Sequence, residues 1–538
     1  MKYSVLVSDK LEAEGLAILE QEPGIALTVK TGMTPAELAE FIGPFHGIII
    51  RSATKVTEEV LKKASNLKAI ARAGAGVDNV DVPAATRRGI VVMNTPGGNT
   101  VSTAEHALAM LMALARRIYP ACASMKAGKW DKKSFTGTEL TGKVLGVVGV
   151  GRVGSEVAKR AVGLRMKVVA FDPYFDRKRA EEIGVEMVDD LNDLLGRSDY
   201  ITIHSPLNEK TRGMIGREQL ERMKKGVGII NCARGGIVDE GALAEAIKSG
   251  KVGGAALDVF SEEPPTDRTL VDMPEVVCTP HLAASTSEAQ LVVAIRAAEQ
   301  MRDALLRNDV RFAVNAPTLE PEEAAKLKPY LELMEKLGLL VSQLCDGPVQ
   351  NVEVRYSGEA AELRLSPLTT CLTMGLLKPF MEPGDVNMVN APVIALERGI
   401  RLSETRRPVA ENFLTAARVE VQSGNEMHVV AGTLFGRDRV RIIEVDGFYL
   451  ESVAVGNLLV IPNMDRPGVI GAIGRILGDH KVNIAYLANG RREAGGQALT
   501  IVNVDSIPGP DVLEALRKNE NILGVKLVRL DAEGAAST

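Results

Sequence analysis

Three residues in the middle of the chain could together oxidise a hydroxy acid. Arg234, Glu263 and His281 each follow an apolar stretch typical of a buried strand. An arginine can hold a carboxylate with two N–H groups, a histidine can take a hydroxyl proton as hydride leaves the carbon, and a carboxylate can orient that histidine. Because the carboxyl ends of neighbouring parallel strands meet at one edge of a sheet, we expect the three to share one crevice. His281 by itself would as often be a hydrogen-bonded structural residue.

A glycine-rich turn predicts the hydride acceptor. Gly149, Gly151 and Gly154 separate an apolar strand pattern from a helical pattern. The first glycine permits the turn, the second lets the backbone approach a pyrophosphate, and the third lets the helix pack on the strand. The next strand pattern ends in Asp172, where an acid would bind a ribose 2′-hydroxyl. A glycine turn alone is weak evidence, but strand, helix and acid together predict dinucleotide binding, with NAD favoured over NADP.

The beginning of the chain predicts an anion-binding region. Strand patterns at residues 3–8, 45–50 and 67–71 alternate with helical patterns, which indicates a parallel α/β unit. Arg51 and Arg72 stand at the ends of two successive strands, where ligands of such sheets gather. A single arginine would more often be a solvated surface charge. Two arginines at neighbouring strand ends favour the anion-binding interpretation.

The composition bounds the class of protein. The 538 residues should form three or four domains, and 46% hydrophobic with 25% charged residues is typical of globular chains. A net charge of −5 gives no basic field for nucleic acid. The five cysteines lack CxxC spacing, so we expect neither a metal site nor disulfides. Without a signal-peptide pattern or a membrane-spanning apolar run, we expect a cytoplasmic protein with no membrane partner.

The motifs around these residues resemble the D-isomer-specific 2-hydroxyacid dehydrogenase family, in its long phosphoglycerate-oxidising form. Segments 231–240, 256–264 and 279–286 carry the resemblance. In that family the arginine binds the substrate carboxylate, the glutamate pairs with the histidine, and the histidine is the acid and base. The resemblance therefore implies these roles for Arg234, Glu263 and His281.

The resemblance also implies further contacts. The residues implied for NAD are Gly149, Gly151, Arg152, Val153, Gly154, Asp172, Ser205, Cys232, Ala233, Arg234, Asp258, His281, Ala283 and Ala284. Those implied for the substrate are Arg51, Ser52, Arg72, Gly76 and Asn99, with Lys129 or Lys132 reaching in from a dimer partner. His204 is expected in a loop near the cofactor. Trp130 is expected either to anchor an interface or to be locally buried.

The predicted fold is α/β throughout. We expect a Rossmann-type doubly wound NAD-binding domain (98–282) inserted in a flavodoxin-like substrate-binding domain (1–97 and 283–315), followed by an α/β intervening domain (316–452). The strand and helix patterns of 456–531 predict a ferredoxin-like βαββαβ module that resembles the ACT domain. Ser102 and Glu105 form a capping-box pattern that predicts the start of a long helix in the NAD-binding domain.

The C-terminal half suggests regulation. By resemblance, Asn463, Asp465 and Asn483 are candidates to bind serine as a feedback effector, the first two in the loop after the first strand of the module. The alternative is a structural ACT module used only for subunit pairing. The arginines at 437, 439 and 441 could hold an anionic effector, although a solvated charge run is the favoured interpretation.

These observations predict an enzyme. The resemblance implies NAD-dependent oxidation of 3-phospho-D-glycerate to 3-phosphohydroxypyruvate, the first step of L-serine biosynthesis, by a homo-oligomer, either a dimer or a tetramer. The alternative is a glyoxylate, hydroxypyruvate or other D-2-hydroxyacid dehydrogenase with the same three residues. A non-enzymatic NAD(H)-sensing corepressor is disfavoured, because Arg234, Glu263 and His281 are all present and no basic tract is found.

Overall fold

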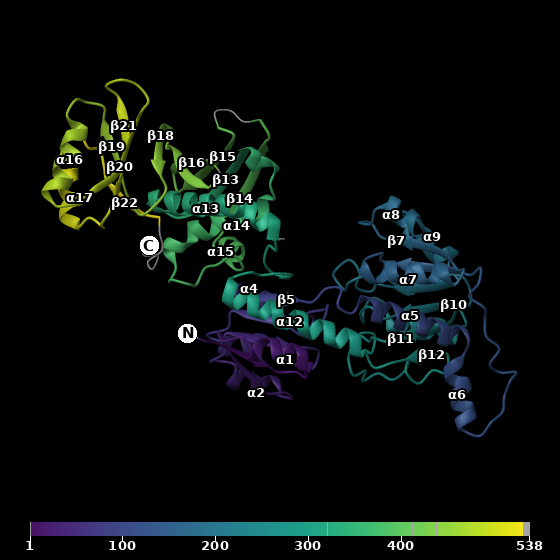
Figure 1. The fold of residues 1–538 in the computed structure, drawn as a ribbon. Coiled ribbons are helices and arrows are strands. Elements are labelled where there is room, and N and C mark those ends of the chain that lie inside the picture. Colours follow the sequence, from purple (N-terminus) through teal and green to yellow (C-terminus); the bar gives the residue numbers. More distant parts are fainter. Residues whose placement is uncertain (1, 320, 410–412, 437, 531–538) are drawn as a thin grey trace.

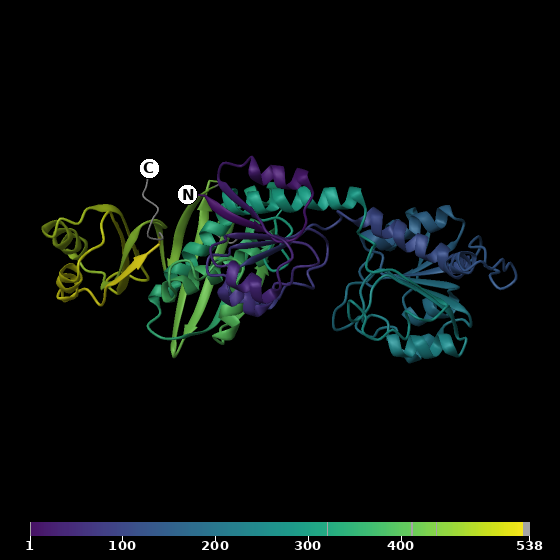
Figure 2. The ribbon, with the colours of Figure 1, turned by 90° about the horizontal axis from the view of Figure 1, so that it is seen from below.

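Four sheets organise the described part of the chain, and each belongs to its own α/β domain (Figure 1). The structure, a computed structural model, describes residues 2–319, 321–409, 413–436 and 438–530. In both views the central and C-terminal domains lie at opposite ends of an extended molecule (Figures 1 and 2). The N-terminal domain and the third domain lie between them.

The N-terminal domain is a five-stranded parallel sheet with strand order β2-β1-β3-β4-β5. This is the flavodoxin-like order. Its strands are apolar because helices cover both faces of the sheet. The elements are β1 (Tyr3–Val7), α1 (Ala13–Glu20), β2 (Ile25–Val29), α2 (Pro35–Phe41), β3 (Gly47–Ile50), α3 (Glu58–Lys63), β4 (Ala69–Arg72), α4 (Val82–Arg87), β5 (Val91–Asn94) and α12 (Ser287–Arg307).

The central domain is the predicted Rossmann-type unit. Its seven parallel strands have the order β12-β11-β10-β9-β6-β7-β8, so the strand order reverses between β6 and β9. Its elements are α5 (Thr100–Ala115), α6 (Ile118–Lys126), β6 (Val144–Val148), α7 (Arg152–Gly163), β7 (Lys167–Phe171), α8 (Arg177–Glu182), β8 (Val185–Met187), α9 (Leu191–Arg197), β9 (Tyr200–Ile203), α10 (Arg217–Arg222), β10 (Val227–Asn231), α11 (Glu240–Lys248), β11 (Val252–Leu257) and β12 (Val276–Cys278).

The chain enters and leaves the central domain at one place. The hydroxyl of Ser102 donates to the carbonyl of Ala283 at 2.7 Å, which joins the entering and leaving segments. After this point α12 returns to the N-terminal domain and packs beside α1 (Figure 1). The predicted capping box at Ser102 and Glu105 is wrong. The helix starts at Thr100, and the Ser102 hydroxyl is used for the contact with Ala283 instead.

The third domain is a six-stranded mixed sheet with order β14-β13-β15-β16-β17-β18, covered on one face by helices. The inward side chains of β13 and β15 alternate with outward polar ones, as expected for a half-buried sheet. Its elements are α13 (Pro321–Leu344), β13 (Val349–Gly358), η1 (Glu359–Glu362), α14 (Leu365–Leu377), η2 (Lys378–Phe380), α15 (Ala391–Glu397), β14 (Arg401–Arg407), β15 (Thr415–Ser423), β16 (Glu426–Phe435), β17 (Arg439–Val445) and β18 (Phe448–Val453).

A loop of the third domain docks on the N-terminal domain. The Asn387 side chain donates to the carbonyl of Gly89 at 2.8 Å, and Val389 packs into the apolar core that contains β1 and α12. Of the three predicted surface arginines, Arg437 lies outside the described residues. Arg439 is exposed, but Arg441 is only partly exposed and its guanidinium lies over the ring of Phe435.

The C-terminal domain has the predicted βαββαβ order, with sheet order β20-β21-β19-β22. Its helices cover one face, and its other face joins the apolar core of the third domain. Asn463 lies within the first strand and not in the loop after it, because pairing with β21 continues to Met464. The elements are β19 (Asn457–Met464), α16 (Val469–Asp479), β20 (Ile484–Arg491), β21 (Gln497–Val504), α17 (Pro510–Arg517) and β22 (Lys526–Arg529).

The shared core predicts that the third and C-terminal domains unfold together. Ile501 on β21 is fully buried in that core. Replacing it by alanine should lower the free energy of unfolding by about 2 to 5 kcal/mol and shift one joint transition, as measured by calorimetry. Ile507→Ala is the control because Ile507 is half exposed, and it should change little. A separate C-terminal transition that alone moves to lower temperature would contradict the shared core.

Candidate active site

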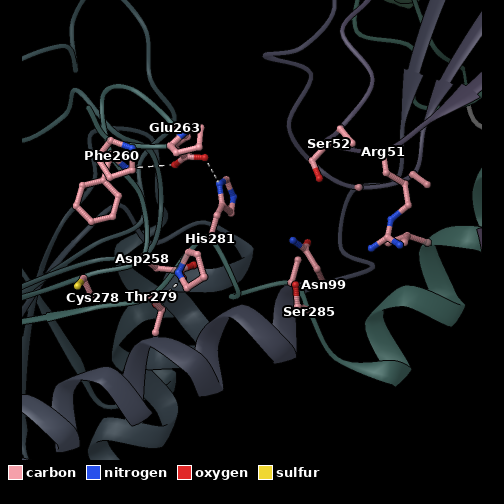
Figure 3. A pocket seen from close by; sticks show the side chains of 18 of the residues that line it. Arg51, Ser52, Asn99, Asp258, Phe260, Glu263, Cys278, Thr279, His281 and Ser285 are labelled. Atoms are coloured by element: carbon pink, nitrogen blue, oxygen red, sulfur yellow. Dashed lines mark hydrogen bonds and ion pairs between the residues drawn. The ribbon is translucent and has the colours of Figure 1, made fainter. Parts of the chain in front are cut away.

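A cavity of about 530 Å³ lies between the N-terminal and central domains. Figure 3 shows Glu263 and His281 on one side of it and Arg51 and Ser52 on the other, with Asn99 between them. The cavity thus brings together residues predicted for chemistry and residues predicted for substrate binding. The predicted residues that line it are Arg51, Ser52, Arg72, Asn99, Asp258, Glu263, His281 and Ala284.

His281 and Glu263 form a pair at the cavity wall. The Nδ1 atom of His281 lies 2.7 Å from Oε2 of Glu263, and the other carboxylate oxygen accepts the backbone N–H of Phe260. The hydrogen bond to Glu263 raises the pKa of His281, against an opposing effect of burial. Burial favours the neutral form of Glu263, but the hydrogen bond and the charge of His281, together with the backbone N–H of Phe260, outweigh this and lower the pKa of the carboxyl. The ring atom left for a substrate is Nε2.

A buried carboxylate holds the loop that carries His281. Asp258, with none of its surface exposed, accepts the hydroxyl of Thr279 at 2.6 Å and the backbone N–H groups of Leu282 and Ala283 at 2.7 and 2.9 Å. The backbone N–H of His281 also donates to the Asp258 carbonyl. These bonds, on both sides of His281, fix the histidine. The predicted contact of Asp258 with the cofactor stays a prediction.

Arg234 follows β10 and, unlike Glu263 and His281, is not among the residues that line the cavity. Its charge acts on Arg72 and His281, which do line it. Its Nε donates to Asp78 at 3.0 Å, and its Nη1 donates to the carbonyl of Ala233. A Cβ at Gly76 would lie 2.0 Å from Nη2, so any larger residue there would displace the guanidinium. Asp78 and Gly76 belong to the N-terminal domain, so the Arg234 contacts cross between the two domains.

Two more arginines stand on the N-terminal side. Burial, together with the neighbouring charges of Arg234 and Arg51, lowers the pKa of Arg72 to about 10 even though Asp78 acts to raise it. The Nε atom of Arg72 is buried with no hydrogen-bond partner. Arg51 keeps its place because its Nη1 donates to the carbonyl of Lys10. The site is therefore cationic and suits an anionic ligand.

The glycine turn can accept a dinucleotide. Gly149 has a left-handed φ of 92°, and a Cβ at Gly154 would lie 2.0 Å from the carbonyl oxygen of Gly149. Helix α7 then begins at Arg152, and its N-cap residue Gly151 offers no side chain to its free N–H groups. Asp172 follows β7, and its oxygens accept the N–H groups of Val150 and Tyr174. These residues fit a pyrophosphate and a ribose in the predicted places.

The remaining predicted cofactor residues surround this turn. The hydroxyl of Ser205 donates to the carbonyl of Val148. Cys232 is buried at the end of β10, and burial strongly raises the pKa of its thiol. His204 directly follows β9, where burial lowers its pKa to about 4, so it stays neutral. Val153 lies on α7 and is partly buried against the apolar core of the domain. Ala233 follows Cys232, and its carbonyl accepts a hydrogen bond from the Arg234 side chain.

Lys129, Lys132 and Trp130 lie away from the cavity of their own chain. They follow α6, whose helix has no buried residue, and the Trp130 side chain is 75% exposed. The locally buried alternative for Trp130 is therefore wrong, and its role as an interface anchor stays a prediction. Any role of the two lysines in this site would have to be played in a second copy of the chain.

Sequence reasoning missed several residues of the site. Asp78, Asn79 and Asp9 all make side-chain contacts to the predicted arginines or their loop. Each follows one of the first-domain strands, the same signal that marked Arg51 and Arg72.

Among the described residues no cluster of histidine, cysteine and carboxylate side chains could hold a metal ion, and no helix is long and apolar enough to cross a membrane.

Three stretches of the chain match family models. Residues 108–283 match the NAD binding domain of the D-isomer specific 2-hydroxyacid dehydrogenases. Residues 326–446 match the D-3-phosphoglycerate dehydrogenase intervening domain, and residues 459–521 match the ACT domain. The three matches follow one another in the order predicted from the sequence.

Whole-length relatives decide the family. The chain is 43% identical to the D-3-phosphoglycerate dehydrogenase of Methanocaldococcus jannaschii, with 98% of this chain and 99% of the relative covered. It is 44% identical to that of Archaeoglobus fulgidus, with 98% and 100% covered. The chain belongs to the D-3-phosphoglycerate dehydrogenase family. The predicted resemblance is thereby confirmed.

A solved structure supports the cofactor of this D-3-phosphoglycerate dehydrogenase family member. The D-lactate dehydrogenase from Aquifex aeolicus, complexed with NAD and lactic acid, is 28% identical with a TM-score of 0.53 and covers 59% of this chain and 100% of that one. Together with the NAD binding domain match, it confirms NAD as the cofactor.

The His281–Glu263 pair generates a pH prediction. His281 must be neutral to accept a proton, and its bond to Glu263 raises its pKa, so oxidation should slow on the acid side from a higher pH than for an isolated histidine. Glu263→Gln should lower that pKa and move the acid limb of kcat/KM to lower pH, while also slowing turnover. Steady-state rates between pH 5 and 10 test this, with the exposed neighbour Glu262→Gln as control. An acid limb that does not move in Glu263→Gln would contradict the coupling.

Proposed function

We propose that the chain oxidises 3-phospho-D-glycerate to 3-phosphohydroxypyruvate with NAD, the entry step of L-serine biosynthesis. The observation that carries this proposal is the cationic cavity. Arg51 and Arg72 line it together with His281 and Glu263, and Figure 3 shows Arg51 across the cavity from that pair. The charge of Arg234 acts on Arg72. A substrate with a carboxylate at one end and a phosphate at the other would meet an arginine at each end. The relatives named above carry the same activity in their names.

In the proposed reaction each side chain has one task. Arg234 holds the carboxylate through Nη2, the guanidinium nitrogen that neither Asp78 nor Ala233 engages. His281 accepts the hydroxyl proton at Nε2, and Glu263 stabilises the resulting imidazolium through Nδ1. NAD, held at Gly149, Gly151, Gly154 and Asp172, supplies the hydride acceptor when it is bound. Arg51 and Arg72 neutralise the phosphate, and the buried unpaired Nε of Arg72 supplies a donor for it.

The alternative substrates lack the phosphate. A glyoxylate, hydroxypyruvate or D-lactate dehydrogenase needs Arg234, Glu263 and His281 but has no anion to place at Arg51 and Arg72. A buried donor without a hydrogen-bond partner costs free energy, so an unphosphorylated substrate would leave the Nε atom of Arg72 unpaired. This observation favours the phosphorylated acid.

The remaining assignments belong to the same proposal. The proposal includes the predicted domain boundaries. It also includes the predicted substrate and cofactor contacts of Ser52, Gly76, Asn99, Ser205, Ala283 and Ala284. The exposed segment around Trp130 supports a homo-oligomer in which Lys129 or Lys132 reaches a neighbouring site, as a dimer or a tetramer. A cytoplasmic location fits an enzyme that feeds amino-acid synthesis.

A substrate panel tests the proposed function. NADH formation should be measured with 3-phospho-D-glycerate, D-glycerate and D-lactate, and NADH consumption with hydroxypyruvate and glyoxylate. We expect 3-phospho-D-glycerate to give the highest kcat/KM. Arg51→Ala should lower this value tenfold or more and leave D-glycerate nearly unchanged, because a lost charged hydrogen bond costs about 1.5 to 3 kcal/mol.

The matched control is Lys55→Ala, which removes an exposed cation four residues along the same loop but outside the cavity lining. It should leave both substrates unchanged. Equal losses for 3-phospho-D-glycerate and D-glycerate in Arg51→Ala would mean that Arg51 serves the structure and not the phosphate. A wild-type enzyme that prefers an unphosphorylated acid would favour the alternative function.

Serine feedback through the C-terminal domain is a second part of the proposal. The match to the ACT domain supports it. The predicted effector residues already have partners within the chain. Asn463, with 2% of its surface exposed, donates to Thr500, Asp465 accepts from Arg491, and Asn483 donates to Asp505. A bound serine would have to share or displace these contacts.

Calorimetry of the intact protein with L-serine tests the effector site. Heat of binding at millimolar serine that disappears in Asp465→Ala is the expected result, because Asp465 would hold the amino group. Asp479→Ala, an exposed carboxylate at the end of α16, is the control and should bind normally. No heat from the intact protein would remove the effector, and unchanged binding in Asp465→Ala would move its site elsewhere.

A further inference from the structure

We propose that the dipeptide Asp78-Asn79 sets the spacing between the two anion-binding ends of the substrate site and thereby selects 2-hydroxy acids with a second anionic group on the far carbon. Asp78 positions the carboxylate-binding Arg234, and Asn79 positions the loop of Arg51. The inference rests on the proposed function and adds two positioning residues to it. Neither residue needs to touch the substrate.

Asp78 acts on the carboxylate end. It accepts the Nε of Arg234 at 3.0 Å, while the Ala233 carbonyl holds Nη1. With two of its nitrogens fixed by two domains, the guanidinium has one orientation, and Nη2 points toward the backbone of Gly76. Asp78 also lies close enough to act electrostatically on Arg72. It is therefore the carboxylate that offsets the repulsion between these two arginines.

Asn79 acts on the phosphate end. Its Nδ2 donates to the carbonyl of Arg51 at 2.7 Å and to the carbonyl of Thr54 at 2.6 Å. The backbone carbonyl of Asn79 also accepts the N–H of Val56 at 2.8 Å. One asparagine thus closes the loop that follows β3 and keeps Arg51 at the cavity rim.

A third side chain makes this loop rigid. The Asp9 carboxylate, 6% exposed, accepts the backbone N–H of Arg51 and both the N–H and the hydroxyl of Thr54. The Arg51 loop is therefore bonded on one side to the end of β1 and on the other to Asn79. Because Asp78 and Asn79 are consecutive, the orientation of Arg234 and the position of Arg51 are set by one short piece of backbone.

The Asp78–Arg234 pair differs from an ordinary surface ion pair. Exposed pairs contribute little because both partners are mobile and solvated. The Asp78 side chain is 67% exposed, but that of Arg234 is only 29% exposed and has a second fixed contact. The pair also joins residues 156 positions apart in two different domains beside the cavity. The Asp78–Arg234 pair would therefore affect substrate binding through the position of Arg234, and not through its contribution to stability.

Crossed kinetics with two substrates test the proposal on the full-length enzyme with NAD. Asp78→Ala should raise KM about tenfold for both 3-phospho-D-glycerate and D-glycerate, because both carry the carboxylate. Asn79→Ala should raise KM about tenfold for 3-phospho-D-glycerate alone, because only this substrate reaches Arg51. In both variants kcat at saturation and NADH binding, followed by fluorescence, should change much less than KM.

Matched controls separate positioning from folding. Asp189→Ala removes the acid of another exposed pair, with Arg177, and Asn66→Ala removes another side-chain donor to a backbone carbonyl, that of Gly43. Both should leave KM unchanged. Activity of Asn79→Ala on D-glycerate would show that this variant is folded. If Asn79→Ala does not fold, Asn79→Ser takes its place in the test and should also lose its selectivity for the phosphorylated substrate.

The possible outcomes distinguish a failure of the proposed function from a failure of the positioning role of Asp78 and Asn79. Failure of the wild-type enzyme to oxidise 3-phospho-D-glycerate overturns the proposed function and this inference with it. A wild-type enzyme that oxidises it, with unchanged KM in Asp78→Ala or with parallel losses for both substrates in Asn79→Ala, overturns only the inference. The expected crossed pattern supports both.

Discussion

The position of His281 depends on the buried carboxylate of Asp258. A carboxylate without exposed surface is stable only when its oxygens are hydrogen-bonded, and here Thr279, Leu282 and Ala283 supply the donors. Those donors lie on both sides of the histidine, so satisfying the acid and fixing the histidine are one requirement. Burial disfavours the charged form of Asp258, but a side-chain hydrogen bond with His106 and the bonds from these three donors together outweigh it and lower the pKa of the carboxyl. The acid therefore remains ionised, and the loop keeps one shape.

The opposite wall of the cavity follows a different rule. There the positive charges are only partly compensated. Burial and the charges of Arg234, which reaches over from the central domain, and of Arg51 all lower the pKa of Arg72. Such an arrangement is costly in the empty site and favourable when an anion enters, which makes the cavity selective for charge. The two walls belong to different domains, and the Arg234–Asp78 pair is the direct ionic contact described between them at this place.

The sequence was sufficient to predict the central strands of the parallel sheets, such as β1, β3 and β4, and the residues at their ends, because buried parallel strands leave an apolar pattern and their carboxyl ends collect ligands. It did not predict β2 and β5 of the same sheet. It was not sufficient for contacts between loops. Asp9 and Asn79 meet the Arg51 loop only after three strands have paired, and nothing in their local sequence records that meeting. Ser102 matched a capping pattern, but a tertiary contact with Ala283 competed for its hydroxyl.

Errors in the C-terminal half have similar causes. The strand β14 was not predicted because it is an exposed edge strand whose sequence, RLSETRR, lacks the alternation of a half-buried one. Asn463 was predicted in the loop after the first strand of the module, but β19 continues to Met464. Its pairing with Ala498 on the neighbouring strand extends it. The strand propensity of a segment's own residues does not indicate how far pairing with a neighbouring strand extends it.

The return of α12 to the N-terminal domain has a consequence for synthesis of the chain. Val293, Ala297 and Met301 on this helix complete the core that contains β1, yet residues 95–286 must leave the ribosome first. The central domain can close its own sheet during that interval, whereas the N-terminal sheet waits with one face open. The domain that begins first is therefore finished second.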